Sequence, residues 1–293
     1  MAFGPLRCRG HVLPVDERVL LMGVLNVTPD SFSDGGVYVA PATAVQRAIT
    51  MVEEGADLID IGAESTRPGA DPVDAAEEWR RLEPVLHELS RRLTVPISID
   101  TTKADIAQRA LDAGAAMIND VSGLQADPRM ARTVAGANAG VVLMHRRGTP
   151  KTMQSLTQYD DVVEEVRAAL AERLTAAQEA GIALDGILLD PGIGFGKNLP
   201  QNLALLANLE RLLTLNRPLL AGPSRKAFIG TLTGRDIAAR MPGTAAAVAL
   251  AVAYGARVVR VHDVGPMRDV VRVAEAIRSA RIAEHESATM GDA

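Results

Sequence analysis

Hydrophobic positions recur along the chain as short continuous runs, each followed by a polar turn and then by a longer segment of helical periodicity. Runs such as 20–25 and 140–144 hold hardly a polar residue, which is typical of parallel strands that are covered on both faces. The pattern predicts eight strands, at residues 20–25, 57–61, 95–99, 116–119, 140–144, 186–190, 218–222 and 257–261. It also predicts eight helices, near residues 41–54, 73–92, 104–113, 128–137, 159–180, 199–215, 243–254 and 266–283.

Glycine marks the points at which predicted helices end and strands begin, at Gly55, Gly114, Gly181 and Gly255. Glycine enters the left-handed conformation that ends a helix at little steric cost. Eight strand–helix units in 293 residues fit an α/β fold, a single (β/α)8 TIM-type barrel, better than an open doubly wound sheet.

No linker rich in proline, glycine or serine divides the chain, so the sequence predicts one domain. Residues 20–283 are expected to form the barrel. Residues 1–19 are expected to form an N-terminal hairpin or plug that leads into it, and residues 284–293 a disordered tail.

The composition of the chain argues against several classes of binding partner. The net charge of −5 and the lack of a basic run argue against nucleic acid. The single cysteine, Cys8, excludes an intramolecular disulfide and a cysteine-based zinc site, as expected for a reducing compartment. No segment is apolar and long enough for a signal peptide or a membrane span, so we expect no membrane partner and a cytoplasmic location.

Polar residues stand at or just after the end of every predicted strand, where TIM barrels place their active sites. In chain order they are Asn26, Thr66, Arg67, Asp100, Asn119, Asp120, His145, Asp190, Ser224, Lys226, Arg260, His262 and Asp263. A single Asp after a strand is often the N-cap of the next helix, and this interpretation stays open for Asp120 and Asp263. Eight coincident polar ends are hard to explain by capping alone, so we predict a functional site there.

The charges of these residues indicate the kind of ligand. Cationic or potentially cationic side chains are expected near one rim: Arg67, Lys226, Arg260 and His262. They would suit a ligand with two or more negative charges. Acceptor groups form a row across neighbouring strands: Asp100, Asn119 and Asp190. Such a row suits a flat, donor-rich heterocycle, so we predict a polar heterocycle attached to an anionic leaving group.

Two features allow other interpretations, a phosphate-binding loop and a Schiff-base lysine, and the sequence argues against both. Residues 192–197 (GIGFGK) resemble a phosphate-binding glycine loop, but they lack the Walker spacing, and Asn198 stands where Ser or Thr would coordinate magnesium. We interpret them as a compact loop with Phe195 lining the site. A Schiff-base role for Lys226 is disfavoured by its place beside Arg225 at the expected start of a helix.

Seven motifs, in this order along the chain, resemble those of the dihydropteroate synthases. The two longest occupy residues 22–36 (MGVLNVTPDSFSDGG) and 60–69 (DIGAESTRPG). Shorter ones lie at 97–101, 118–120, 189–192, 224–226 and 260–263, and the resemblance covers roughly residues 19–280.

The resemblance implies a reaction and a set of site residues. The family joins p-aminobenzoate to 6-hydroxymethyl-7,8-dihydropterin diphosphate and releases diphosphate, giving the folate precursor 7,8-dihydropteroate. The pterin diphosphate would be held by Thr66, Asp100, Asn119, Asp190, Lys226, Arg260, Val261 and His262. The p-aminobenzoate would contact Phe32, Pro68, Phe195 and Ser224. Asn26 would reach a Mg²⁺ ion, and the catalytic roles would fall to Asp100, Lys226, Arg67 and His262.

The resemblance also implies a route and an assembly. Diphosphate would leave first, its growing charge matched by Mg²⁺, Arg67 and His262, and the arylamine would then attack a pterin methyl cation near Asp100. We expect the long loops after the first two strands to close over the substrates. A homodimer through the helices at 243–254 and 266–283 is expected as well.

Two rival functions share part of this pattern. A pterin-binding methyltransferase would use the acidic residues but has no use for Arg67 and the segment 224–226. A pterin-binding protein without activity would not need every polar position to be filled. The sequence does not decide whether sulfonamides inhibit the protein.

Overall fold

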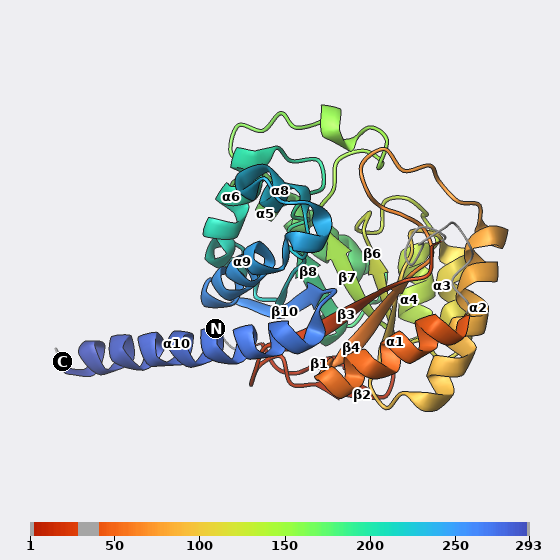
Figure 1. The fold of residues 1–293 in the computed structure, drawn as a ribbon, viewed down its shortest axis with the longest axis horizontal. Helices are drawn as coiled ribbons and strands as arrows, with labels where there is room; N and C mark the ends of the chain where they lie inside the picture. The colour runs from red at the N-terminus through yellow and green to blue at the C-terminus, as the bar shows by residue number, and fades with distance from the viewer. Residues whose placement is uncertain (1–2, 29–40, 292–293) are drawn as a thin grey trace.

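Eight parallel strands form a closed barrel in the order β10-β3-β4-β5-β6-β7-β8-β9 (Figure 1). The computed structural model describes residues 3–28 and 41–291, with the backbone alone for 282–291. The strands of the barrel are β3 (Leu20–Asn26), β4 (Leu58–Gly62), β5 (Ile97–Asp100), β6 (Met117–Asp120), β7 (Gly140–Met144), β8 (Ile187–Asp190), β9 (Leu219–Ala221) and β10 (Ala256–Val261). The predicted (β/α)8 barrel is confirmed, and each predicted strand lies within two residues of an observed one at either end.

Helices cover the outside of the barrel (Figure 1). They are α1 (Pro41–Glu54), α2 (Ala75–Arg92), α3 (Ala104–Asp112), α4 (Met130–Gly136), α5 (Val162–Glu179), α6 (Leu199–Ala207), α7 (Leu209–Leu212), α8 (Ala227–Thr233), α9 (Met241–Ala253) and α10 (Val264–Gly291). All four glycines predicted to join helix to strand have positive φ: Gly55, Gly114, Gly181 and Gly255.

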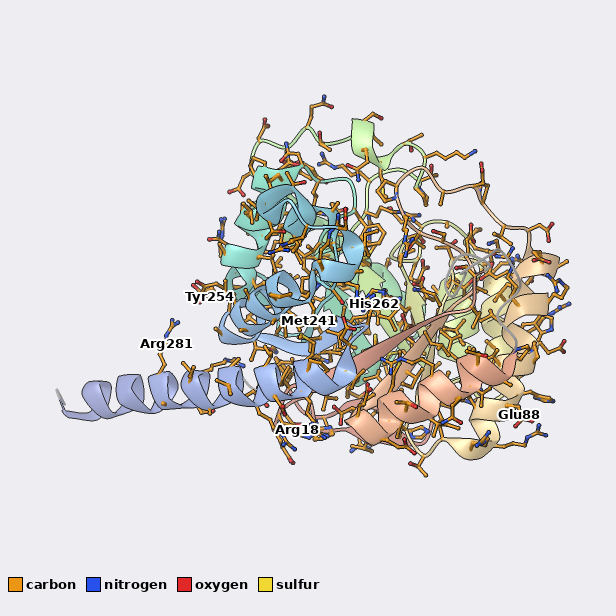
Figure 2. All side chains as sticks on the ribbon, viewed as in Figure 1. Arg18, Glu88, Met241, Tyr254, His262 and Arg281 are labelled. Carbon is orange, nitrogen blue, oxygen red and sulfur yellow. The ribbon has the colours of Figure 1, made fainter. Side chains whose placement is uncertain are left out.

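The structure corrects the predicted helices in three places. Residues 199–215 are not one helix, because Asn208 leaves the helical conformation with φ −124° and separates α6 from α7 and from a 3-10 turn at Leu213–Leu215. The short helix α8 is absent from the predicted ranges. The expected loose tail is helical as far as Gly291, because α10 continues beyond the barrel (Figures 1 and 2).

A short hairpin closes the N-terminal end of the barrel, formed by β1 (Leu6–Cys8) and β2 (His11–Leu13). Its buried side chains Leu6, Cys8 and Leu13 belong to the same apolar cluster as side chains from the strands: Leu20, Met22, Leu58, Met117, Val142, Leu188, Leu220 and Val258. The interior is therefore filled at this end, as in other barrels of this class.

Local capping explains the residue that follows the glycine-rich motif. The side chain of Asn198 accepts a hydrogen bond from the backbone N–H of Gln201, and the side chain of Gln201 accepts one from the backbone N–H of Asn198. This capping box begins α6. Asn198 therefore caps a helix at the position where a phosphate-binding loop would have a magnesium ligand. No helix in the described ranges is both long and apolar enough to cross a membrane.

Candidate active site

The interior of the barrel changes from apolar to polar toward the C-terminal ends of its strands. Residues two apart on a strand point to the same face, so the residue two positions after an inward-facing side chain also points inward. The apolar layer is followed by a polar one on four strands: Leu58 by Asp60, Met117 by Asn119, Leu188 by Asp190, and Val258 by Arg260. This alternation places the predicted acceptor residues and Arg260 around a common centre.

Asp60 organises this polar layer, although no role is predicted for it from the sequence. Its side chain is fully buried, and Oδ2 accepts hydrogen bonds from Nε of Arg260 at 2.6 Å and from Nδ2 of Asn119 at 2.9 Å. Nη2 of Arg260 donates to Oδ2 of Asp100 at 2.9 Å. A charged residue inside the apolar run of β4 was the signal that could have identified it, since unpaired carboxylates are almost never buried.

Asp100 offers a free acceptor at the end of β5. Burial raises the pKa of Asp100 to about 7, against the opposing effect of Arg260. Its Oδ1 atom is buried and has no hydrogen-bond partner within residues 3–28 and 41–291. A buried acceptor of this kind suits a ligand that brings its own N–H donors. Burial also raises the pKa of Asp190, whose Oδ1 accepts from the backbone N–H of Gly192 at 2.7 Å.

Lys226 lies next to these carboxylates, immediately before α8. Its Nζ atom is 3.9 Å from the centre of the Phe195 ring, which gives a cation–π contact. Burial lowers the pKa of Lys226 to about 8, with Arg260 adding to the effect and Asp190 and Asp100 opposing it. The two residues predicted to contact different substrates are thus in contact with each other.

Ser224 and His262 form a second pair on the cationic side. The Oγ atom of Ser224 lies 2.9 Å from Nδ1 of His262 and accepts a hydrogen bond from the backbone N–H of His262 at 3.2 Å. Burial lowers the pKa of His262 to about 3, with Arg260 and Arg225 adding to the shift. His262 is therefore neutral near pH 7. Neutral imidazole has one ring N–H, and the donor in the contact between Oγ and Nδ1 is set by the tautomer of the ring.

The two aspartates left open by the sequence both have structural partners. Asp120 accepts hydrogen bonds from the backbone N–H groups of Ser122 and Leu124 and from the hydroxyl of Ser122. Asp263 forms an ion pair with Arg225 at 2.5 Å. Neither lines the cavity described next, so both are better explained by local structure.

A cavity of about 670 Å³ opens at the C-terminal ends of the strands. Most of the predicted site residues line it: Asn26, Thr66, Arg67, Pro68, Asp100, Phe195, Ser224, Lys226, Arg260 and His262. Asn119 and Asp190 are buried and do not line it. Phe32 lies outside the described residues.

The prediction for Val261 is wrong as far as its side chain is concerned. Val261 is fully buried in the core outside the barrel, among residues such as Val259 and Val264. Consecutive side chains of a strand point to opposite faces, so Arg260 points into the barrel and Val261 away from it.

The loop after β4 brings Thr66, Arg67 and Pro68 to the rim. Nζ of Lys103 donates hydrogen bonds to Glu64, at the start of this loop, and to Glu78 of α2. The backbone N–H of Gly69 donates to the carbonyl of Pro150 at 3.0 Å. This loop is therefore anchored at both ends, while Arg67 and Pro68 remain exposed between them.

The donor groups at this cavity fit one kind of metal site. The described residues hold no group of three or more His, Cys, Asp or Glu side chains that could bind a metal. Asn26, however, lies at the end of β3 and lines the cavity. Magnesium in phosphate sites is usually held by one or two protein groups together with phosphate oxygens and water. One amide oxygen beside an anion-binding rim therefore fits a Mg²⁺ ion that arrives with a diphosphate.

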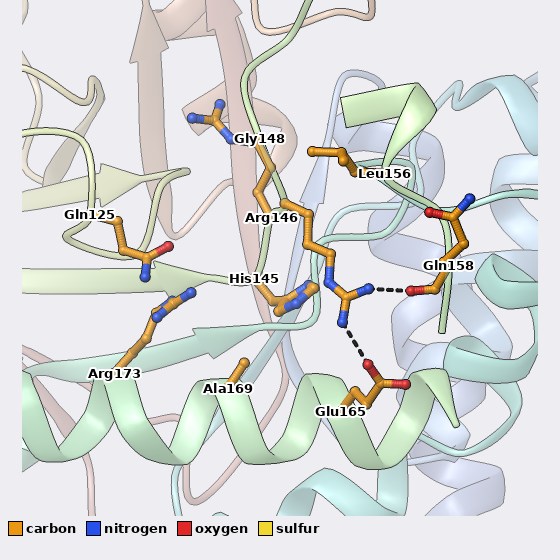
Figure 3. A pocket seen from close by; sticks show the side chains of 10 residues that line it. Gln125, His145, Arg146, Gly148, Leu156, Gln158, Glu165, Ala169 and Arg173 are labelled. Atoms are coloured by element: carbon orange, nitrogen blue, oxygen red, sulfur yellow. Dashed lines mark hydrogen bonds and ion pairs between the residues drawn. The ribbon is translucent and has the colours of Figure 1, made fainter. Parts of the chain in front are cut away.

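A second cavity, of about 350 Å³, lies beside α5 and the loop after β7 (Figure 3). Arg147 pairs there with Glu165 at 2.6 Å and also donates to the carbonyl of Gln158. Of the polar residues predicted at strand ends, only His145 lines this cavity. His145 is buried, and its Nδ1 atom lies 3.0 Å from Nζ of Lys197.

Comparisons with known proteins agree with this geometry. Residues 22–262 match the family described as pterin binding enzyme. The dihydropteroate synthase of Synechocystis is 47% identical over 262 residues, which are 89% of this chain and 91% of the relative. The structure of the Xanthomonas albilineans dihydropteroate synthase with 4-aminobenzoic acid superposes with a TM-score of 0.88 at 46% identity, over 94% of this chain and 99% of that one. A structure of the same enzyme with 7,8-dihydropteroate has a TM-score of 0.84 at 44% identity, over 94% and 98%.

The barrel with its buried acceptor layer and the family match define a class: the chain belongs to the pterin binding enzymes. Within that class, the identities over nine tenths of the relatives' length place it in the dihydropteroate synthase family, whose members are transferases of folate synthesis.

Proposed function

We propose that this protein condenses 6-hydroxymethyl-7,8-dihydropterin diphosphate with p-aminobenzoate to give 7,8-dihydropteroate and diphosphate, a step of folate biosynthesis. The observation that carries the proposal is the buried layer of Asp60, Asp100, Asn119 and Arg260 beneath a cavity with a cationic rim. The complexes of the Xanthomonas enzyme with 4-aminobenzoic acid and 7,8-dihydropteroate support the same substrates here.

The pterin ring would bind at the polar layer. Its amino group and ring N–H groups can donate to the free Oδ1 of Asp100 and to Asp190, and the amide of Asn119 can both donate and accept. Lys226 would donate to a ring acceptor, and Arg260 would stack on the face of the ring. Asp60 would fix Arg260 and Asn119 in the positions that this binding requires.

The diphosphate would lie at the rim between Thr66, Arg67 and His262. The bond between the pterin methylene carbon and the diphosphate oxygen breaks first, and the electron pair leaves on that oxygen. Arg67 and His262 would match the charge that develops on the leaving group. Mg²⁺, held by Asn26 and the diphosphate oxygens, would supply further neutralisation of that charge.

The p-aminobenzoate would lie between Pro68 and Phe195, with Phe32 proposed as a further contact. Its carboxylate would meet Ser224 in the turn before α8. The arylamine nitrogen then bonds to the methylene carbon and loses a proton. No enzyme nucleophile takes part, and the negative charge of Asp100 would stabilise the cationic carbon before this attack.

An assay of diphosphate release tests the proposal. Release coupled to formation of 7,8-dihydropteroate is expected when pterin diphosphate, p-aminobenzoate and Mg²⁺ are all present, and Asp190→Ala and Lys226→Ala should each reduce it strongly. Asn26→Ala should raise the Mg²⁺ concentration needed for half-maximal activity. Diphosphate release without formation of 7,8-dihydropteroate, although p-aminobenzoate is present, would exclude the synthase reaction, and methyl transfer from methyltetrahydrofolate would support the methyltransferase instead.

We further propose that the protein acts as a homodimer in the cytoplasm. Three large apolar side chains on α9 and α10 are more than half exposed, namely Leu250 (52%), Val273 (61%) and Ile277 (65%). These two helices lie side by side (Figure 1). Exposed apolar side chains on neighbouring helices favour contact with another protein surface. The free thiol of Cys8 agrees with a reducing compartment.

A further inference from the structure

The lysine of the glycine-rich motif points into its own loop. Lys197 is 3% exposed. Its Nζ atom donates hydrogen bonds to the carbonyls of Gly192 at 3.0 Å and Phe195 at 2.9 Å, and to Nδ1 of His145 at 3.0 Å. A phosphate-binding loop would instead aim its lysine outward at a ligand. Here the ammonium binds the carbonyls that the loop folds around it.

The backbone of the loop is shaped for this arrangement. Gly192, Gly194 and Gly196 have φ of 70°, 85° and 60°, a region that other residues rarely adopt. A Cβ atom on Gly192 would meet the carbonyl oxygen of His145 at 2.0 Å. The alternating glycines therefore let the loop turn its carbonyls toward Lys197 while it stays close to the strand ends.

Burying the ammonium group of Lys197 costs free energy. Burial lowers the pKa of Lys197 to about 7, with Asp190 opposing the shift and Lys226 and Arg147 adding to it. Burial also lowers the pKa of His145 to about 2, so its ring is neutral and can accept a hydrogen bond at Nδ1. The Nζ atom of Lys197 has four acceptors, the carbonyl of His145 at 3.4 Å being the fourth, so the buried lysine ties the loop to the end of β7 at several points.

Other contacts tie the same loop to the rest of the protein. The hydroxyl of Tyr159 donates to the carbonyl of Gly196 at 3.1 Å. Asn202 accepts from the N–H of Gly194 at 2.6 Å and donates to the carbonyl of Lys197 at 3.1 Å. His145 lies in the wall of the second cavity (Figure 3). Its contact with Lys197 links the loop to that wall.

The loop presents two groups to the active site. The carbonyl of Phe195 accepts a hydrogen bond from Lys197. The ring of Phe195 lies 3.9 Å from Nζ of Lys226. The aliphatic part of Lys226 lies so close to Gly194 that a Cβ atom there would meet its Cδ at 3.0 Å. A shift of the loop would therefore move the aromatic wall of the cavity first.

We propose that Lys197 is a positioning residue, whose ammonium fixes the loop 192–197 so that Phe195 forms the wall that p-aminobenzoate binds. The inference rests on the proposed function for the identity of that substrate. Lys197 acts through Phe195, because its Nζ atom is engaged by the loop carbonyls and by His145. The pterin is held mainly by strand residues, so p-aminobenzoate should be affected first.

The full-length Lys197→Met variant tests this, since methionine fills similar space without donating hydrogen bonds. Steady-state kinetics should show the KM for p-aminobenzoate raised on the order of tenfold or more, because Phe195 is no longer held where the substrate binds. The KM for pterin diphosphate should change less than about threefold, the effect of a contact worth only a few tenths of a kcal/mol. Lys151→Met, which removes an exposed lysine paired with Asp71, is the matched control and should leave both values unchanged.

Hydrogen exchange of the amides in 192–197 gives a readout independent of activity. Exchange there should be faster in Lys197→Met than in wild type. If Lys197→Met does not fold, Tyr159→Phe removes a single loop contact and should raise the KM for p-aminobenzoate about threefold, as expected for one neutral hydrogen bond. A folded Lys197→Met with wild-type KM values and wild-type exchange overturns the inference. A wild-type protein without synthase activity overturns the proposed function instead, and the exchange data still decide whether Lys197 orders the loop.

Discussion

Replacing Asp60 by asparagine would test the physical basis of the whole polar layer. Asp60 accepts from both Arg260 and Asn119 through one buried oxygen. Asparagine keeps the shape of the side chain but removes its negative charge. Arg260 would then keep only Asp100 as a carboxylate partner.

The expected loss of stability follows from burial. Removing one partner of a buried ion pair costs roughly 3–5 kcal/mol. We expect about 3 kcal/mol for Asp60→Asn, the lower end of that range, because Arg260 retains Asp100 and the amide oxygen can still accept one hydrogen bond. The KM for pterin diphosphate should rise as well, since Arg260 and Asn119 lose the group that orients them.

Urea denaturation of the wild type and the variant measures the effect. Asp105→Asn is the matched control, because Asp105 is also paired with an arginine, Arg129, but is 64% exposed. Exposed pairs contribute little, so the control should lose much less stability. Equal losses for the two variants, or a wild-type KM for Asp60→Asn, would refute the claim that Asp60 organises the site.

Three further predictions concern pH, loop closure and assembly. Lys226 loses its proton as the pH rises through about 8, so the KM for pterin diphosphate should rise at alkaline pH. Lys226→Arg should move this rise to higher pH. If the rise stays at the same pH, another group causes it. Hydrogen exchange in residues 27–40 should slow when a pterin diphosphate analogue and p-aminobenzoate are added together, and unchanged exchange would argue against closure of this loop. Leu250→Glu should convert a dimer into a folded monomer in size-exclusion chromatography, whereas a dimeric variant would place the interface elsewhere.

The elements of the barrel could be predicted because their signals are local. A buried parallel strand needs a continuous apolar run, and the glycines at helix ends meet a backbone requirement that the next few residues create. The break between α6 and α7 was missed because Asn208 carries no strong local stop signal, and the end of α10 was placed too early for the same reason.

The sequence by itself determined which residues stand at the strand ends, and most of the predicted site residues line the cavity. It could not determine which way each of them points. Arg260 and Val261 are neighbours in the chain, yet only the closed barrel decides that one faces the site and the other the outer core.

The tertiary structure also decided the roles of Asp60 and Lys197. The charge of Asp60 is balanced by Arg260, which is 200 residues away in the chain. Lys197 finds an acceptor in His145, 52 residues before it. Such pairs form because burial makes an unpaired charge costly, and only the folded chain brings the compensating groups together.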